Sequence, residues 1–297
     1  MAIQWYPGHM HKARKKIKEN ITKIDIVIEV LDARIPYSSE NPLVAQLRQN
    51  RPCIKVLNKS DLADPNITKA WIKHFNQEKG VKAVSVVGDK KGPTRSTIND
   101  TISFCKRWLP ERNFNSKPVR IMILGIPNVG KSTIINALSN KSIARVGNEP
   151  AITKAQQFIH LDDGVLLCDT PGILWPKIEE EGSGYRLAIT GAIKNTAIEF
   201  EDVAMYAADY FMRNFPEQVI KRYQLDELPS SDVELLEIIG RKRGGLRAGG
   251  RIDMNKASEV LLHDYRANFL GSLSLESPAM LDDLTKEENI ADKQAKD

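Results

Sequence analysis

Four near-continuous apolar runs divide the first part of the chain and predict buried strands. They cover residues 24–31, 53–57, 81–87 and 119–124. Strands of a parallel sheet, which are covered on both faces, have this pattern. Helical patterns lie between them, and one helix is expected to begin with Asp64 as its cap and Pro65 at its first position, and to stop at Gly80. Strands that alternate with helices predict an α/β domain with a mostly parallel sheet.

A strand pair of another kind is expected over residues 156–168. The tight-turn dipeptide Asp163-Gly164 separates the segments 156–161 and 165–168, as in a hairpin. After about residue 196 the strand signals end. Helical spacing then predicts an all-α region, in which the helices cover residues 202–215, 232–239 and 255–270.

These patterns divide the chain into four parts. We expect a basic N-terminal arm (1–22), an α/β domain (23–196), an all-α domain (197–281) and a polar tail (282–297) whose composition predicts disorder. The length of 297 residues accommodates two domains.

Composition narrows the class of protein. The shares of 41% apolar and 27% charged residues are those of a globular protein, and no apolar run approaches the roughly 18 residues of a membrane span. The N-terminus lacks an apolar signal core, which argues against secretion. Cys53, Cys105 and Cys168 lie far apart, which argues against disulfides and a zinc site, and Cys53 and Cys168 are expected to be buried. We therefore expect a cytoplasmic protein.

Residues 125–132 read GIPNVGKS and match the phosphate-binding loop Gly-x4-Gly-Lys-Ser. The match follows a predicted strand and opens a predicted helix, as the motif requires. Lys131 would supply charge to the β- and γ-phosphates, as a catalytic group, and the Ser132 hydroxyl would bind Mg²⁺. The expected nucleotide contacts of this loop are Asn128, Val129, Gly130, Lys131, Ser132 and Thr133.

The loop alone does not choose between ATP and GTP, but residues 58–61 do. They read NKSD and follow the strand 53–57. The Asp61 carboxylate can accept hydrogen bonds from guanine N1–H and N2–H₂, which adenine does not offer, so that adenine would leave it buried and unpaired. Asn58 would contact the base and brace the loop, and Lys59 would lie along the base. Ser85 and Val86 would form a weaker guanine-contact loop.

Residues 169–172 read DTPG and end the strand 165–168. Asp169 suits binding of Mg²⁺ through a water, and the Gly172 N–H can reach the γ-phosphate. Thr153, between this motif and the phosphate loop, is the natural switch threonine, which would bind Mg²⁺ and sense the γ-phosphate as part of the catalytic set. The alternative is that Thr153 is an ordinary exposed loop residue.

The motif order is unusual, because the guanine motif precedes the phosphate loop. The same sheet can still form, since permutation only relocates the termini. Together with QWYPGHM at residues 4–10 and DARIP at 32–36, the chain resembles the ribosome biogenesis GTPase A family of circularly permuted GTPases over nearly its whole length. The resemblance implies a circularly permuted P-loop GTPase domain followed by an all-α domain. It also implies GTP hydrolysis coupled to late assembly of the large (50S) ribosomal subunit.

Ras-like enzymes orient the attacking water with a glutamine two residues after the Asp-x-x-Gly glycine. Here Ile173 and Leu174 follow Gly172, as in the resembling family, and neither can bind water through its side chain. Our hypothesis for a substitute is the imidazole of His9, which can donate or accept a proton at neutral pH. The alternative is that His9 only packs or contacts RNA.

Asn128 suggests a second hypothesis. As in potassium-activated GTPases, it could help to hold K⁺ beside the β- and γ-phosphates, where the cation would supply the charge that an arginine finger otherwise brings. The alternative is that Asn128 only braces the loop.

Two basic segments indicate RNA as a partner, with no sign of DNA or membrane binding. The first, at residues 9–18, lies beside Trp5 and Tyr6, and the second is a Gly-rich stretch at residues 240–251. Cations with aromatic or flexible neighbours suit RNA. The alternative is a solvated helix face and a flexible connector. The expected RNA contacts are Lys12, Arg14, Lys15, Lys16, Arg241, Lys242, Arg243, Arg247 and Arg251.

Three functions remain open from the sequence. The chain is a ribosome-assembly GTPase that binds GTP, GDP and rRNA and is stimulated by the ribosomal particle, or a nucleotide switch acting on a protein signalling partner, or an RNA-binding protein with a regulatory GTP site. We expect a monomer.

Overall fold

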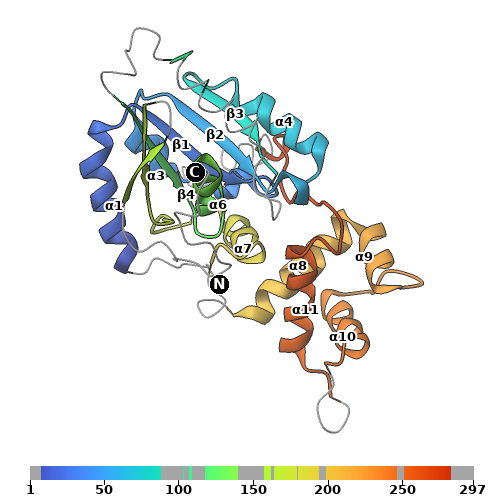
Figure 1. Ribbon diagram of the computed structural model, residues 1–297. Helices are drawn as coiled ribbons and strands as arrows, with labels where there is room; N and C mark the ends of the chain where they lie inside the picture. The colour runs from blue at the N-terminus through green and yellow to red at the C-terminus, as the bar shows by residue number, and fades with distance from the viewer. Residues whose placement is uncertain are drawn as a thin grey trace, which may run out of the picture. The chain divides into compact units, whose positions relative to one another are not determined.

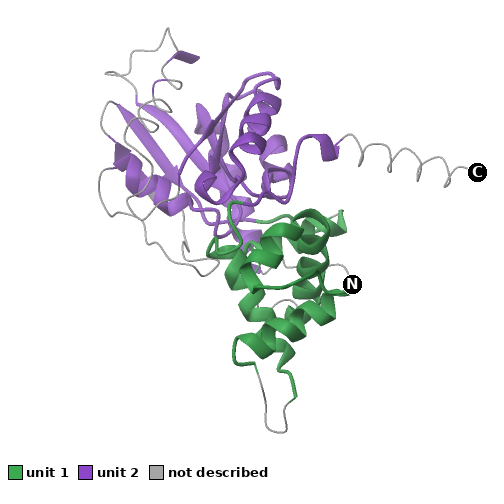
Figure 2. Ribbon diagram, turned by 90° about the vertical axis from the view of Figure 1, so that its right-hand side faces the viewer, with its two compact units in different colours: residues 1–7, 148–150, 174–272 green, residues 8–147, 151–173, 273–297 purple. Residues whose placement is uncertain are grey.

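The computed structural model describes residues 8–87, 103, 107–108, 118–139, 157–161, 164–178, 180–193, 199–245 and 251–281 (Figure 1). The chain divides into two compact units (Figure 2). The sheet unit contains the described residues within 8–173 and 273–281, and the helical unit contains those within 174–272.

The sheet unit is built on a six-stranded sheet in the described residues, with the order β3-β2-β1-β4-β6-β5. Neighbouring strands run parallel, except that β5 is antiparallel to β6. The strands are β1 (Ile26–Asp32), β2 (Cys53–Asn58), β3 (Val81–Ser85), β4 (Val119–Gly125), β5 (Gln157–Leu161) and β6 (Val165–Asp169). The apolar runs and the hairpin predicted from the sequence are confirmed.

Burial explains the apolar runs. Every residue of β1 and of β2 is buried, as expected for central strands with both faces covered. Cys53 and Cys168 are fully buried free thiols within one hydrophobic cluster, as predicted. Trp71 and Phe75 belong to the same cluster.

Helices and short 3-10 turns connect the strands of the sheet unit. They are α1 (Gly8–Asn20), η1 (Ile21–Lys23), α2 (Pro36–Ser39), α3 (Pro42–Arg48), η2 (Ser60–Leu62), α4 (Pro65–Phe75) and α6 (Lys131–Ser139). The predicted cap of α4 is confirmed, because the Asp64 carboxylate accepts from the N–H groups of Asn66 and Ile67. The helix ends at Phe75 and not at Gly80, since the chain needs the intervening turns to enter β3.

The helical unit contains α7 (Glu181–Ile189), α8 (Phe200–Asn214), α9 (Pro216–Tyr223), α10 (Asp232–Lys242) and α11 (Met254–Arg266). Its all-α character is as predicted, although α7 and α9 were not expected. On α8, Val203, Ala207 and Phe211 are buried, whereas Tyr206 is half-buried and stacks on Tyr185 at 4.3 Å between ring centroids.

The unit boundaries differ from those expected. Residues 174–193 group with the helices, and residues 273–281 return to the sheet unit. The segment that we expected to be a free basic arm contains α1, which buries Met10, Ala13 and Ile17. None of the helices in the described part of the chain is both long and apolar enough to span a membrane. The tail from residue 282 lies outside the described residues.

Candidate functional site

The guanine motif and the phosphate loop meet at the carboxyl edge of the sheet. Asn58 ends β2 and Gly125 ends β4, with β1 between these two strands. The Asn58 amide donates from Nδ2 to the backbone oxygen of Val129 at 2.7 Å. Asn58 is 2% exposed, so this bond lies out of water. The structure therefore brings together two motifs that are about 70 residues apart in the sequence, which confirms that the permuted order still builds one edge.

The phosphate loop has a backbone that tolerates no side chain at its second glycine. Gly130 has φ +97°, and a Cβ there would lie 2.1 Å from Asn58 Nδ2. Asn128, which precedes it by two residues, also has positive φ, at +58°. Left-handed residues that alternate with right-handed ones turn their N–H groups toward one concave side, where an anion can bind.

Lys131 begins α6 and is buried. Its Nζ donates to the backbone oxygens of Gly125 at 3.0 Å and Ile126 at 2.8 Å. Burial lowers the pKa of Lys131 to about 8, and the nearby Asp169 carboxylate opposes this shift. The ammonium is thus held inside the loop, with the carboxylate at the end of β6 close enough to interact with it.

Gly172 packs directly on the phosphate loop. A Cβ at Gly172 would lie 2.8 Å from the Cα of Pro127 and 3.0 Å from Lys131 Nζ. The next residue, Ile173, donates its N–H to the backbone oxygen of Gly125 at 3.3 Å. Ile173 and Leu174 are both fully buried, so the side chains that replace the glutamine of Ras-like enzymes point into the protein.

Hydrogen bonds to Val86, which directly follows β3, hold the loop after β2 in place. The Ser60 N–H donates to Val86 O at 3.1 Å, and the Val86 N–H donates to Leu57 O at 2.8 Å. Asp61 lies on η2 and is exposed, as a carboxylate that reads a base must be. Ser85 ends β3 beside this loop. The two predicted guanine-contact segments are therefore neighbours.

Asp32 and Arg34 form a buried ion pair beside the guanine motif, which the sequence alone did not reveal. Asp32 lies opposite Asn58 in the parallel register, and its buried carboxylate accepts from Arg34 and from Lys59. In the sequence, the available signals were a carboxylate directly after a predicted strand and its place in the DARIP run at residues 32–36.

The chain matches known proteins along almost all of its length. Residues 120–239 match the family described as 50S ribosome-binding GTPase. Ribosome biogenesis GTPase A of Bacillus pumilus is 45% identical, with 94% of this chain and 99% of the relative covered. The protein of the same name from Thermotoga maritima is 33% identical, with 93% and 95% covered.

A solved structure agrees with these matches. GNP-bound YlqF from T. maritima has a TM-score of 0.68 and 30% identity, with 90% of this chain and 98% of that one covered. The chain belongs to the ribosome biogenesis GTPase A family. Membership in this family shows that the protein is a GTP-hydrolysing enzyme of ribosome assembly with a circularly permuted P-loop fold. GTPases of this fold generally bind their nucleotide with Mg²⁺.

Part of the expected site lies outside the described residues. Thr153 and Arg247 are not among them, and for His9 only the backbone, in the first turn of α1, is described. Within the described residues, no group of three or more His, Cys, Asp or Glu side chains is arranged to hold a metal by itself.

The predicted RNA-contact residues fall into two groups. On α1, Lys12, Arg14, Lys15 and Lys16 are all exposed. In the helical unit, Arg241, Lys242, Arg243 and Arg251 are also exposed. The two groups therefore belong to different units of the chain.

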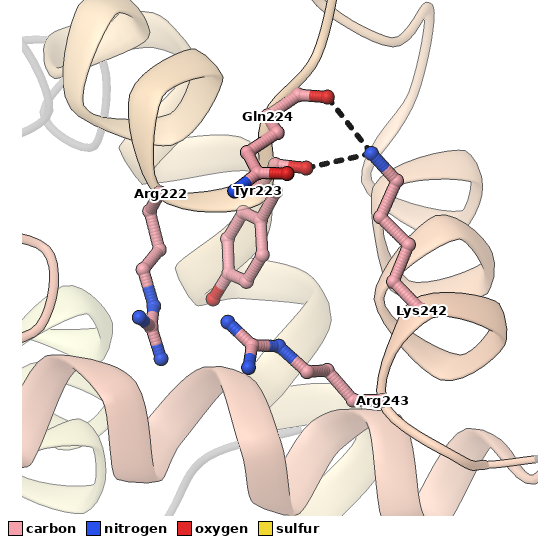
Figure 3. A pocket seen from close by; sticks show the side chains of 5 residues that line it. All are labelled: Arg222, Tyr223, Gln224, Lys242 and Arg243. Atoms are coloured by element: carbon pink, nitrogen blue, oxygen red, sulfur yellow. Dashed lines mark hydrogen bonds between the residues drawn. The ribbon is translucent and has the colours of Figure 1, made fainter.

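Two members of the second group, Lys242 and Arg243, line a cavity of about 400 Å³ in the helical unit. The other lining residues are Arg222, Tyr223 and Gln224 (Figure 3). Lys242 donates to the backbone oxygens of Tyr223 and Gln224, at 2.7 and 2.8 Å. Arg222 is held by two hydrogen bonds to Asp264, each of 2.8 Å. Two of the three cations are thus ordered by the fold. Arg243 points into the same space, beside the Tyr223 ring (Figure 3).

Proposed function

We propose that this GTPase acts in late assembly of the large ribosomal subunit, where it binds rRNA and is stimulated in turnover by the ribosomal particle. The observation that carries the proposal is the exposed cationic side of α1. Its buried positions follow helical spacing and leave the cations Lys12, Arg14, Lys15 and Lys16 on the solvent side. Such a cationic row suits the phosphate backbone of RNA.

The nucleotide is proposed to span the edge described above. Asp61, Asn58 and Lys59 would hold the guanine, with Ser85 and Val86 close by. The phosphates would lie on the loop from Asn128 to Thr133, with Gly172 at the γ-phosphate. This assignment is supported by the Asn58–Val129 bond, which joins the base and phosphate halves.

The magnesium ligands are proposed to be Ser132, Thr153 and, through a water, Asp169. Hydroxyl and carboxylate oxygens are the donors that Mg²⁺ prefers, and Asp169 is close enough to Lys131 to affect its pKa. The ion would neutralise charge on the phosphates.

Two hypotheses concern hydrolysis. If His9 orients the water, His9→Ala should reduce turnover and leave nucleotide affinity unchanged, and an unchanged ribosome-stimulated rate would refute this role.

If Asn128 helps to hold K⁺, the rate of GTP hydrolysis in KCl should exceed that in NaCl at equal ionic strength. Equal rates would refute this second hypothesis.

The decisive experiment is cosedimentation with purified large subunits and with cell extract. We expect the protein to pellet with the particle when a non-hydrolysable GTP analogue is present, and much less when GDP is present. Large subunits should also raise GTP turnover.

We also propose a cytoplasmic location, since bacterial ribosomes are assembled there, and a monomeric state in solution.

The other outcomes identify the alternatives. Nucleotide-dependent capture of a non-ribosomal protein, with no particle binding, would favour a signalling switch. Particle or RNA binding that ignores the nucleotide, without stimulation of turnover, would favour an RNA-binding protein with a regulatory GTP site.

A further inference from the structure

A buried carboxylate at the end of β1 holds the lysine of the guanine motif. Asp32 is the last residue of β1, and Lys59 follows its register partner Asn58. Lys59 Nζ donates to Asp32 Oδ2 at 2.9 Å. The side chain of Asp32 is 3% exposed and that of Lys59 is 21% exposed. The ammonium end of Lys59 is therefore tied to a rigid strand.

Asp32 is itself fixed by Arg34. The Arg34 guanidinium donates from Nε to Oδ1 at 2.9 Å and from Nη2 to Oδ2 at 2.8 Å, and the Arg34 N–H donates to Oδ1 at 3.1 Å. Burial alone would raise the pKa of Asp32, but the charges of Arg34 and Lys59 outweigh it and hold this pKa well below its usual range. The carboxylate is thus ionised and oriented to accept from Lys59.

The backbone of Lys59 is also in an uncommon conformation. Its φ of +59° and ψ of +35° lie in the left-handed region, which a lysine rarely adopts. With the backbone turned in this way and Nζ held on Asp32, the four-carbon stem is fixed at both ends.

We propose that Asp32 is a positioning residue for nucleotide binding, which holds the stem of Lys59 in place for contact with the guanine ring. A free lysine loses much rotamer freedom when it is ordered by a ligand, and ordering it beforehand removes that cost from binding. The inference rests on the proposed contact between Lys59 and the base.

Asp32 should affect the affinity for nucleotides with and without the exocyclic N2 group equally. The stem of Lys59 contacts the ring and does not read the exocyclic N2 group, which is assigned to Asp61. Loss of Asp32 should therefore weaken GDP and inosine diphosphate by the same factor. A general distortion of the guanine loop would instead displace Asp61 and reduce the preference for GDP.

The test is a double-mutant cycle with Asp32→Asn and Lys59→Met, in which Kd values for GDP and inosine diphosphate are measured by calorimetry on the full chain. We expect each single variant to raise both Kd values by roughly 10-fold, and the double variant to be no weaker than Lys59→Met alone. Asp264→Asn is the matched control, because Asp264 is also a buried carboxylate paired with an arginine, but in the helical unit. It should leave both Kd values unchanged.

Four results would overturn the proposal. If the double variant raised Kd by the product of the two single factors, Asp32 would act without Lys59. A lower GDP preference in Asp32→Asn would show that it acts through Asp61. An unchanged Kd in Asp32→Asn beside a weakened Lys59→Met would exclude the positioning role and leave the nucleotide site intact. An unchanged Kd in Lys59→Met would remove the proposed base contact as well.

A measurement on the unsubstituted protein covers the case in which Asp32→Asn does not fold. With ¹⁵N-labelled lysine, the ammonium signal of Lys59 should show hindered proton exchange in the GDP complex, because the ion pair persists there. The Lys59→Met spectrum assigns the signal. Rapid exchange at Lys59 in that complex would contradict the inference.

Discussion

At the scale of single residues, Lys131 is sensitive to what lies in the phosphate loop. Its ammonium is buried and bound to two backbone oxygens, and its pKa is lowered to about 8. A bound phosphate would favour the charged form and raise that pKa. Nucleotide binding should therefore be coupled to protonation of this lysine.

We predict that GDP binding takes up a proton above pH 8. At about pH 6.5 Lys131 of the nucleotide-free protein is almost fully charged, so proton uptake is small; at pH 8.5 it should be between about half and one proton per GDP. Calorimetry in buffers of different ionisation enthalpy measures this number. The Lys131→Met variant, titrated at higher concentration, should lack this uptake. Any proton uptake that remains in the variant would come from another group, such as guanine N1, and not from Lys131. Equal uptake in the two proteins would contradict the assignment.

At the scale of elements, the C-terminal segment 273–281 belongs to the sheet unit although it follows the last helix of the helical unit. The Leu275 N–H donates to Arg34 O at 2.8 Å, and the Asp64 N–H donates to Ser274 Oγ at 3.1 Å. The Glu276 carboxylate accepts from both the N–H and the hydroxyl of Ser38. The segment thus ties together the loops that follow β1 and β2.

We predict that Glu276→Ala destabilises the sheet unit by about 2–3 kcal/mol, because it leaves buried donors of Ser38 without an acceptor. For a unit of this size Tm should fall by roughly 4–12 °C. Thermal unfolding followed by circular dichroism measures the change. Glu259→Ala is the control, because Glu259 is exposed and pairs with Lys256 on the surface, where such pairs contribute little. Equal Tm values for the two variants would show that the contacts of the Glu276 carboxylate with Ser38 do not contribute to stability.

At the scale of the whole molecule, cations are exposed on both units. The side of α1 carries Lys12, Lys15 and Lys16, and the helical unit carries the cavity with Lys242 and Arg243. If both contact RNA, binding should depend steeply on salt, since each phosphate contact releases counterions.

We predict that reversing three charges on α1, with Lys12→Glu, Lys15→Glu and Lys16→Glu together, weakens binding to large subunits. The slope of log Kd against log salt concentration should fall by about 2, because up to three phosphate contacts are lost. Kd for GDP should be unchanged. Lys69→Glu with Lys73→Glu, on the exposed side of α4, is the matched control. A salt slope that is the same in both variants would exclude α1 from the RNA interface.

Much of the fold could be predicted from local patterns. The buried strands were predicted because strands covered on both faces need apolar residues throughout. The cap at Asp64 was predicted because its chemistry is local. A helix in the N-terminal segment was considered only as the alternative to an RNA-binding arm, because its few apolar residues are spaced among many lysines and only the sheet unit gives them something to pack against. The short α9 was missed as well, since eight residues give little periodic signal.

The sequence by itself determined the chemistry of the site, because a phosphate loop and a guanine motif require particular residues at fixed local spacing. Their order along the chain also gave the permutation. Only the tertiary structure decided which residues meet across the sheet: Asn58 with Val129, Asp32 with Lys59, and Glu276 with Ser38. These pairs are joined by strand order and by the return of the chain after the last helix. Such long-range contacts leave no periodic signal in the sequence, because each partner is chosen by the packing of other elements.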